Sequence, residues 1–256
     1  MKVSFTGRSS QIGEYFQGDY NFCSYDLFDS STWTPLVNSD VVFLLLPKHK
    51  DTLNGTKKLI LRLMDSSVKH IIKIGSLGPW RLVHNQIDTF IKESGIAYTS
   101  FDIAPLMNNI FTEQYIAEHN TLLDYRGGSP APYLDPRCLA SAIEQSVDND
   151  NHKNRNYRCT GNTQYTIRQV KDILNSTGFA VDKVETTSNQ VLHDLKDTND
   201  QLLMTKIGER YTTEGWFPPV SNDLKENFNT NARTLEKFIS EDRHIFNKRF
   251  LDDKSL

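Results

Sequence analysis

The chain has 256 residues, of which 38% are hydrophobic and 11% aromatic, so it has enough apolar side chains to bury a continuous core. Lysine and arginine number 29 against 32 acidic residues, a formal net charge of -3, which disfavours non-specific nucleic-acid binding. Cys23, Cys138 and Cys159 are odd in number and widely spaced, which indicates neither a disulfide framework nor a zinc site and fits a reducing cytoplasm. No stretch approaches the roughly 20 apolar residues that cross a bilayer. We therefore expect a soluble cytoplasmic protein with no membrane partner.

The first hundred residues alternate between apolar runs and helix-compatible segments. Residues 41–46, Val-Val-Phe-Leu-Leu-Leu, have no polar alternation, which is typical of a strand that flanking helices bury on both faces. Further strands are predicted at residues 2–6, 21–25, 69–74 and 96–101, and helices at about 30–37, 52–64 and 83–91. This order predicts a doubly wound parallel α/β sheet, with ligands bound at the carboxyl ends of its strands.

The second half of the chain has a looser rhythm. A loop at 127–132 precedes a short strand and a helix that carries Leu139, Ala142, Ile143 and Val147. Residues 148–156 are polar and predict an exposed loop, and residues 157–161 predict a strand. Helices are predicted after Thr166 and at about 188–210 and 231–246.

A glycine-containing turn follows the first strand. Gly7 and Gly13 have the outer spacing of a dinucleotide-binding loop, with Ser9-Ser10 where a second glycine is expected, so the motif alone is weak. The serine hydroxyls could bind a pyrophosphate, and Arg8 could pair with a phosphate, including the 2′-phosphate that distinguishes NADP from NAD. The alternative is an ordinary strand-to-helix turn with a solvated arginine.

Two polar residues follow the strand at 69–74. Ser76 is expected at the carboxyl end of that strand, where its hydroxyl could reach a substrate, although a helix-capping serine is the simpler interpretation. His84 lies in the next helix and could donate or relay a proton, with a surface histidine as its alternative. No Tyr-x-x-x-Lys pair occurs near this segment, which argues against the most familiar short-chain dehydrogenase chemistry.

Taken in order, these pieces resemble the NmrA-like family of atypical short-chain dehydrogenase/reductase relatives, which bind NAD(P). The resemblance lies in residues 6–13 (TGRSSQIG, similar to TGATGxxG), 39–47 (SDVVFLLLP), 68–78 (VKHIIKIGSLG, similar to VKxxVxLSSLG), and the stretch from His84 through SGIAYT to Ala104-Pro105-Leu106-Met107-Asn108-Asn109. Residues 133–137 and 157–161 extend the similarity, so that it covers most of the chain.

The resemblance implies a Rossmann-like core at 1–130, shortened in its amino-terminal half, and a smaller α+β substrate-binding part at 131–256 packed on it. Carried over by position, the pyrophosphate would be surrounded by Gly7, Arg8, Ser9, Ser10, Gln11 and Ile12. Leu46, Pro47 and Ser76 would line the path to the nicotinamide, and Ser76 and His84 would be the polar groups nearest the chemistry. Pro105, Met107 and Asn108 would shape the substrate side.

Several positions depart from the family pattern. Ser10 replaces the middle glycine of TGATGxxG, Asp102-Ile103 replaces Arg-Pro, Asp88 stands for Glu, and Cys138 stands for an aspartate. The segment between Gly13 and Leu27 has room for one helix and one strand, whereas the family has two of each. Weakened or lost binding of NADP or NAD is therefore an open alternative.

Two functions of different classes follow from these observations. The first is an NAD(P)H-dependent reductase of a small organic substrate, in which the protein orients and desolvates the reactants. The second is a dinucleotide-sensing or cofactor-free protein that regulates a partner through its Rossmann surface. A cofactor-independent cyclase or isomerase is a third alternative. Fold does not decide among them, and the sequence carries no signal for the substrate or the oligomeric state.

Overall fold

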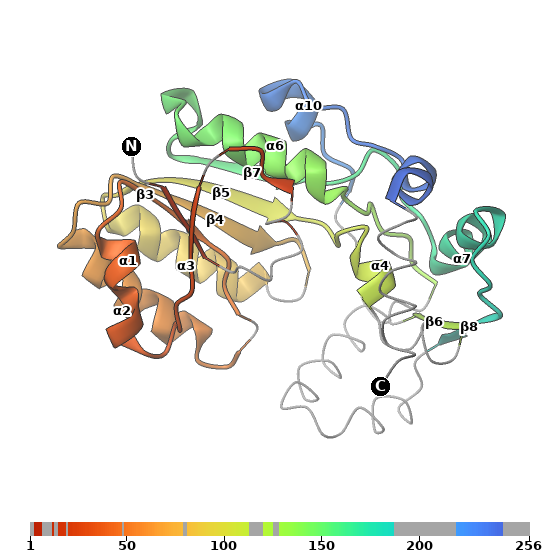
Figure 1. Cartoon of the computed structure of the whole chain (residues 1–256), viewed down its shortest axis with the longest axis horizontal. Helices are drawn as coiled ribbons and strands as arrows, with labels where there is room; N and C mark the ends of the chain where they lie inside the picture. Colours follow the sequence, from red (N-terminus) through yellow and green to blue (C-terminus); the bar gives the residue numbers. More distant parts are fainter. Residues whose placement is uncertain are drawn as a thin grey trace. The chain divides into compact units, whose positions relative to one another are not determined.

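The computed structural model describes residues 3–6, 12, 15–18, 20–47, 49–78, 81–112, 120–124, 128–186 and 219–242 (Figure 1). The helical patch predicted at 188–210 lies outside these residues, as do Gly7 to Gln11 of the predicted cofactor turn. Within the described part of the chain, no helix has the length and apolar character needed to span a membrane.

The principal sheet has six strands in the order β2-β1-β3-β4-β5-β7, and every neighbouring pair is parallel. Its strands are β1 (Val3–Thr6), β2 (Asn21–Cys23), β3 (Val41–Leu44), β4 (His70–Ser76), β5 (Ala97–Ile103) and β7 (Arg155–Cys159). Residues Val41 to Leu44 are all buried, because helices cover both faces of the sheet. The predicted doubly wound, Rossmann-like sheet is confirmed.

Two groups of helices cover the sheet. On one face lie α1 (Thr34–Val37), α2 (Thr52–Met64) and α3 (Arg81–Glu93), preceded by the 3-10 helix Ser30–Trp33; on the other lie α6 (Pro136–Val147) and α10 (Asp223–Phe228) (Figure 1). The first face packs a core that includes Leu36, Leu59, Ile60, Ile71 and Ile87. Helix α3 ends where Gly95 adopts a φ of 76°, a conformation that glycine reaches without a steric penalty.

A second, two-stranded parallel sheet pairs β6 (Thr121–Asp124) with β8 (Lys183–Thr186). Helix α7 (Ile167–Ser176) packs on it and begins with a capping box, in which Thr166 accepts from the Gln169 backbone and the Gln169 side chain accepts from the Thr166 backbone. Val170 and Leu174 of α7 join Leu235 and Phe238 in a separate apolar core. The predicted helix after Thr166 is confirmed.

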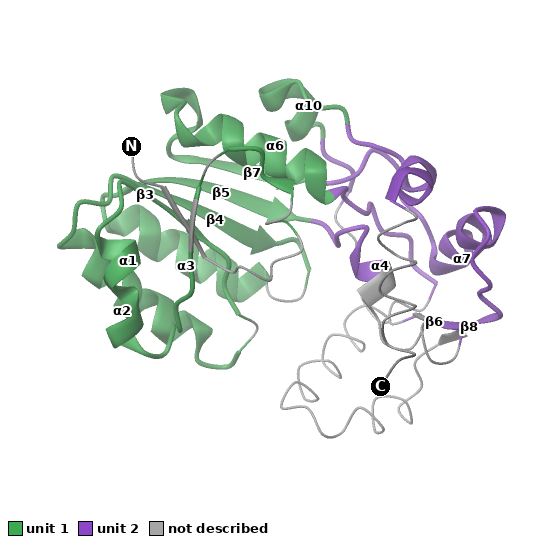
Figure 2. Cartoon of the chain, in the orientation of Figure 1, with its two compact units in different colours: residues 1–103, 136–159, 222–231 green, residues 104–135, 160–221, 232–256 purple. Residues whose placement is uncertain are grey.

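The chain forms two compact units (Figure 2). Unit 1 contains residues 1–103, 136–159 and 222–231, and unit 2 contains residues 104–135, 160–221 and 232–256. The chain therefore passes between the units several times instead of dividing once. The assignment of cofactor binding to residues 1–130 and substrate binding to 131–256 stays a prediction.

The interpretation of residues 148–156 as an exposed loop is wrong in part. A 3-10 helix forms at Asp150–His152 because the Asn149 side chain accepts a hydrogen bond from the Asn151 backbone, and β7 already begins at Arg155. His152 is buried, its ring stacks on Phe228 at 4.4 Å between centroids, and its Nδ1 lies 2.8 Å from the Tyr157 hydroxyl. This polar segment therefore packs against α10 through the contact between His152 and Phe228.

Candidate functional site

The order of the strands defines where a ligand site is expected. From β1 the chain proceeds to β2 on one side, and then to β3 on the other side of β1, so the sheet has a topological switch between β1 and β3. In open parallel sheets, ligands bind outside the carboxyl ends of the strands at such a point. The segments after Thr6 and after Leu44 therefore flank the candidate site.

The first flank is the glycine turn. Gly7, Arg8, Ser9, Ser10 and Gln11 lie outside the described residues, so their predicted contacts stay predictions. Ile12 is 2% exposed, and its carbonyl accepts a hydrogen bond from Tyr15 N at 3.0 Å. The predicted contact between Ile12 and a cofactor is not tested, but its side chain is part of the apolar interior.

The segment after the turn is attached to α6 through one carboxylate. Gln17 N and Gly18 N donate to Oε1 of Glu144 at 2.7 and 2.8 Å. Burial, together with Glu144, raises the pKa of Tyr20 to about 12. Glu144 therefore fixes the chain between the glycine turn and β2.

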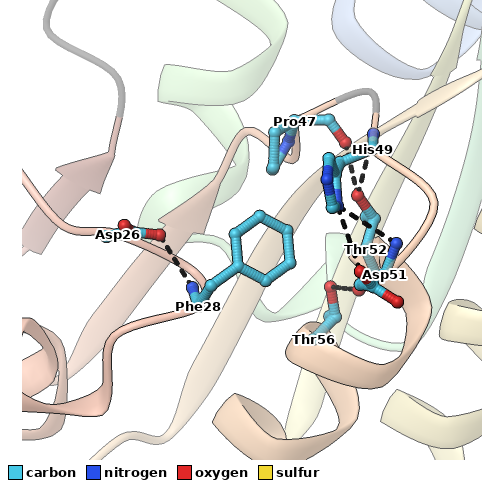
Figure 3. A network of polar contacts seen from close by, with 7 residues as sticks. All are labelled: Asp26, Phe28, Pro47, His49, Asp51, Thr52 and Thr56. Carbon is cyan, nitrogen blue, oxygen red and sulfur yellow. Dashed lines mark hydrogen bonds and ion pairs between the residues drawn. The ribbon is translucent and has the colours of Figure 1, made fainter. Parts of the chain in front are cut away.

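The second flank is the connection from β3 to α2, in which Leu46 is half-buried and Pro47 exposed. The Thr52 hydroxyl donates to the Pro47 carbonyl at 2.7 Å and accepts from His49 N at 3.2 Å, and Asp51 N donates to His49 Nδ1 at 3.2 Å (Figure 3). These bonds turn the chain directly from the strand end into the helix. The predicted contact of Leu46 and Pro47 with a nicotinamide cofactor stays a prediction.

An aromatic contact joins this connection to the loop after β2. The rings of Phe28 and His49 lie 4.8 Å apart between centroids (Figure 3), and Asp26 Oδ1 accepts from Phe28 N at 2.8 Å. Phe28 is nevertheless 49% exposed. A large exposed aromatic ring beside strand ends is suited to stacking on a planar ligand.

A cavity of about 410 Å³ lies next to Phe28, in the size range of small-molecule sites. Its lining comes from the 27–33 segment and from the first turns of α2, and consists of Leu27, Phe28, Ser30, Trp33, Asp51, Asn54, Gly55 and Lys58. Apolar walls with a few amide, carboxylate and ammonium groups can hold a ring and hydrogen-bond its polar edge.

Ser76 is the last residue of β4, as predicted. Its Oγ accepts a hydrogen bond from Gly78 N at 3.0 Å, so the hydroxyl stabilises the turn that follows the strand. A hydroxyl that accepts one bond can still donate its own proton. A role of Ser76 in chemistry stays a prediction.

His84 lies in α3 and is half-buried. It is one turn before Asp88, so the two side chains share a face of the helix. Its predicted proton-transfer role also stays a prediction.

The strands β4 and β5 and helix α3 bring together a cluster of charged side chains, in which Lys73 and Asp88 are buried and Asp102 is half-buried. Lys73 Nζ lies 2.9 Å from Asp88 Oδ1, and the two side chains are only 1% and 5% exposed. Gly75 and Asp102 are opposite each other in the β4-β5 register, and Oδ1 of Asp102 is buried without a hydrogen-bond partner among the described residues. Isolated charges do not remain buried in a protein, so this group acts as one electrostatic unit.

Burial raises the pKa of Asp102 to about 6; Lys73 opposes the rise, Asp88 adds to it, and Arg81 and Arg158 oppose it more weakly. On the other face of the sheet, burial and Lys153 lower the pKa of His70 to about 4, and His70 Nε2 bonds the Thr99 hydroxyl at 2.9 Å. Both groups are thus biased toward their neutral forms.

The predicted substrate residues belong to unit 2. Leu134 N donates to the Pro105 carbonyl, and Met107 N donates to the Leu134 carbonyl, both at 2.9 Å. Met107 is 1% exposed and packs in the core of unit 2, and Asn108 is 6% exposed. Contact of Pro105, Met107 and Asn108 with a substrate stays a prediction.

Sequence reasoning did not identify the charged cluster or the Phe28 cavity. A lysine inside the apolar run HIIKIGS and an aspartate inside AYTSFDI were the available signals, because a charge in a strand covered on both faces needs a partner. No comparable signal marks the cavity. Among the described residues, no group of three His, Cys, Asp or Glu side chains is arranged to hold a metal ion.

Comparison with solved structures identifies the same fold elsewhere. A nucleoside-diphosphate-sugar epimerase from Staphylococcus aureus is 17% identical with a TM-score of 0.77, covering 94% of this chain and all of that one. A triphenylmethane reductase from Citrobacter sp., complexed with NADP(H), is 14% identical with a TM-score of 0.75, covering 94% of this chain and 99% of that one. An NADPH-dependent quinone oxidoreductase from Escherichia coli, complexed with NADPH, is 16% identical with a TM-score of 0.75, covering 96% of this chain and all of that one.

The chain is therefore an α/β protein with the Rossmann-like fold that these reductase and epimerase structures share. No protein-family model and no curated protein matches the sequence. At these identities the similarity establishes the fold and leaves the activity to be argued from the site.

Proposed function

We propose that this protein binds a nicotinamide dinucleotide at the carboxyl edge of its principal sheet and reduces a small organic substrate there. The observation that carries the proposal is the reversal of strand order between β1 and β3, two parallel neighbours in one sheet. It supports a site at their carboxyl ends, where the Gly7 turn and the Leu46-Pro47 segment follow in the sequence. Solved structures of similar fold that contain NADP(H) or NADPH support it.

The residues present fit such a ligand at its adenosine end. Phe28 offers an exposed aromatic face, and the cavity beside it contains Asn54, Asp51 and Lys58 as hydrogen-bonding groups. The backbone N-H groups of the Gly7 turn would hold the pyrophosphate, as the sequence motif predicts. Arg8 and Lys58 are the cations that could favour NADP over NAD.

The chemistry needs little from the side chains. A reduced nicotinamide supplies a hydride when it is bound. Ser76, at the end of β4, would orient the substrate through its hydroxyl, and His84 would hold or relay the proton that follows hydride addition. Leu46 and Pro47 would exclude water from this edge.

The test is turnover of NADPH and NADH with a panel of electrophilic small molecules such as quinones and cationic dyes. We expect oxidation of at least one reduced nucleotide, and we expect Ser76→Ala to lower kcat. Loss of the Gly78 hydrogen bond should lower the stability of this variant by only about 1 kcal/mol, so it should remain folded. Unchanged kcat in Ser76→Ala would restrict this serine to its hydrogen bond with Gly78. Nucleotide binding without oxidation across the panel would contradict the reductase.

A second candidate is a dinucleotide-binding regulator without turnover. It is favoured by the short connection between β1 and β3, whose described residues form the three-residue strand β2, the 3-10 helix Ser30–Trp33 and the four-residue helix α1. It is also favoured by the hydrogen bond that engages Ser76 Oγ in its own turn. The two candidates differ in one result: the regulator would bind the nucleotide and leave it unoxidised with every substrate.

A further inference from the structure

We propose that Asp102 is a positioning residue of the candidate site: it takes up a proton among the charged side chains of β4, α3 and β7, and thereby sets the charge at the strand ends. The ligand in this inference rests on the proposed function, whereas the proton uptake does not.

The geometry around Gly75 carries the proposal. An added Cβ at Gly75 would meet Asp102 Oδ1 within contact distance and Lys73 Nζ at 3.1 Å, so the carboxylate and the ammonium lie over the same glycine. Lys73 is already in ion-pair contact with Asp88 at 2.9 Å. One buried ammonium thus faces two carboxyl groups, and a proton on Asp102 removes the surplus negative charge.

Other charged groups surround Asp102 from each neighbouring element. Helix α3 contributes Arg81 in addition to Asp88, and β7 contributes Arg158, which is opposite Asp102 in the register. Arg158 N donates to Asp223 Oδ2 of α10 at 2.6 Å, and burial keeps the pKa of the Cys159 thiol well above its ordinary value. None of these groups replaces the hydrogen bond that Oδ1 of Asp102 lacks among the described residues.

The position of Asp102 connects this proton to the site. Asp102 pairs with Gly75, the residue before Ser76, and Leu77 N donates to the Ile103 carbonyl at 3.0 Å. A negative charge at this edge disfavours a polyanionic ligand nearby, because the low-dielectric interior screens it poorly. Protonation of Asp102 should therefore strengthen dinucleotide binding.

The experiment compares the wild type with Asp102→Asn, which keeps the shape but not the titration. Asp40→Asn is the control, because Asp40 pairs with the exposed Lys69 at 3.2 Å just before β3, at the amino ends of the strands. Urea unfolding from about pH 4 to pH 7 measures proton uptake without a ligand. Calorimetric titration with NAD⁺ and NADP⁺ from about pH 5 to pH 8 measures the coupling.

The first ratio is the equilibrium constant for unfolding of Asp102→Asn divided by that of the wild type. We expect this ratio to fall roughly tenfold or more between about pH 4 and pH 7, because the wild type loses stability as Asp102 loses its proton. The second ratio is the nucleotide Kd of the wild type divided by that of Asp102→Asn. We expect it to increase roughly threefold or more between about pH 5 and pH 8. The ratios for Asp40→Asn should stay flat. The 2′-phosphate of NADP⁺ also titrates in this pH range, but its effect on Kd is the same for every variant and cancels in the ratio.

Each failure has a separate meaning. A flat unfolding ratio for Asp102→Asn overturns the proton uptake, whether or not nucleotides bind. If the unfolding ratio changes with pH but the Kd ratio does not, Asp102 takes up a proton without affecting nucleotide binding, and the proposed coupling is wrong. No nucleotide binding by any variant contradicts the proposed function and the coupling together, and the unfolding ratio still decides whether Asp102 takes up a proton.

Discussion

The carboxylate of Asp102 occupies the space that a side chain at Gly75 would need. The two residues are opposite each other in the parallel register of β4 and β5, and a Cβ on Gly75 would approach Oδ1 more closely than real Cβ atoms do. Gly75 is therefore required for close approach of a charged group and not for an unusual backbone angle.

This relationship predicts that Gly75→Ala destabilises the protein by about 1–3 kcal/mol, as other overpacked sites do. Asp102→Ala removes the opposing carboxylate, so Gly75→Ala made in that background should be nearly neutral. Urea unfolding of the two single variants and the double variant gives the coupling energy. Additive effects would show that the two side-chain positions do not compete for one space.

The Lys73–Asp88 pair makes a second prediction. Lys73→Met leaves Asp88 buried without its cation and should lower the free energy of unfolding by about 3–5 kcal/mol. Lys73→Met combined with Asp88→Leu replaces the whole pair by apolar side chains and should recover most of that loss. Thermal or urea unfolding measures both effects. If the double variant is no more stable than Lys73→Met, the loss of stability comes from altered packing and not from the unpaired charge of Asp88.

Asp102 and His70 predict opposite effects of pH on stability. The raised pKa of Asp102, about 6 against 3.8, gives stability at low pH that is lost as pH rises through the folded value. The lowered pKa of His70, about 4 against 6.5, destabilises the folded state as pH falls from 6.5 toward 4. Each shift corresponds to about 3 kcal/mol, so the two nearly cancel in the wild type.

The pH dependence of each group is therefore expected to be visible only when the other group is replaced. In Asp102→Asn the His70 effect remains and stability should rise between about pH 4 and pH 6, while in His70→Asn it should fall over the same range. Unfolding midpoints recorded across this range decide it. Equal pH dependence in both variants would mean that other groups control acid stability.

Phe28 and Lys58 give a prediction for the cavity beside α2. Phe28→Ala removes the exposed ring and should weaken dinucleotide binding by about 1–3 kcal/mol, the range seen when a stacked aromatic is lost. Lys58→Met should weaken NADPH more than NADH if its ammonium meets the 2′-phosphate. Leu61→Ala, which removes another exposed side chain of α2 (53% exposed), is the control and should bind normally.

Local sequence patterns predicted the elements whose boundaries depend on neighbouring residues. Uninterrupted apolar residues marked the buried strand at Val41, and Thr166 marked the start of α7. The position of β7 as the sixth strand of the principal sheet was not predicted, because pairing of Tyr157 with Phe101 depends on contacts far apart in sequence.

The same distinction explains the site. Ser76 was correctly placed at a strand end because that position follows from the strand alone. The cluster of Lys73, Asp88 and Asp102 was missed because it combines two strands and a helix. The charges inside the two strands indicate that a partner is needed, but the sequence does not show which residue that partner is. Because helices cover both faces of the sheet, Lys73 and Asp88 are buried and only Asp102 keeps some exposure.

The central claim is that the carboxyl edge between β1 and β3 seats a nicotinamide dinucleotide. Its most direct test is titration of the purified protein with NADPH and NADH, followed by nicotinamide fluorescence, with Gly7→Val as the variant that blocks approach to the turn. We predict saturable micromolar binding of at least one nucleotide by the wild type and its loss in Gly7→Val. The claim would be contradicted if the wild type bound neither nucleotide, or if Gly7→Val bound them as tightly as the wild type.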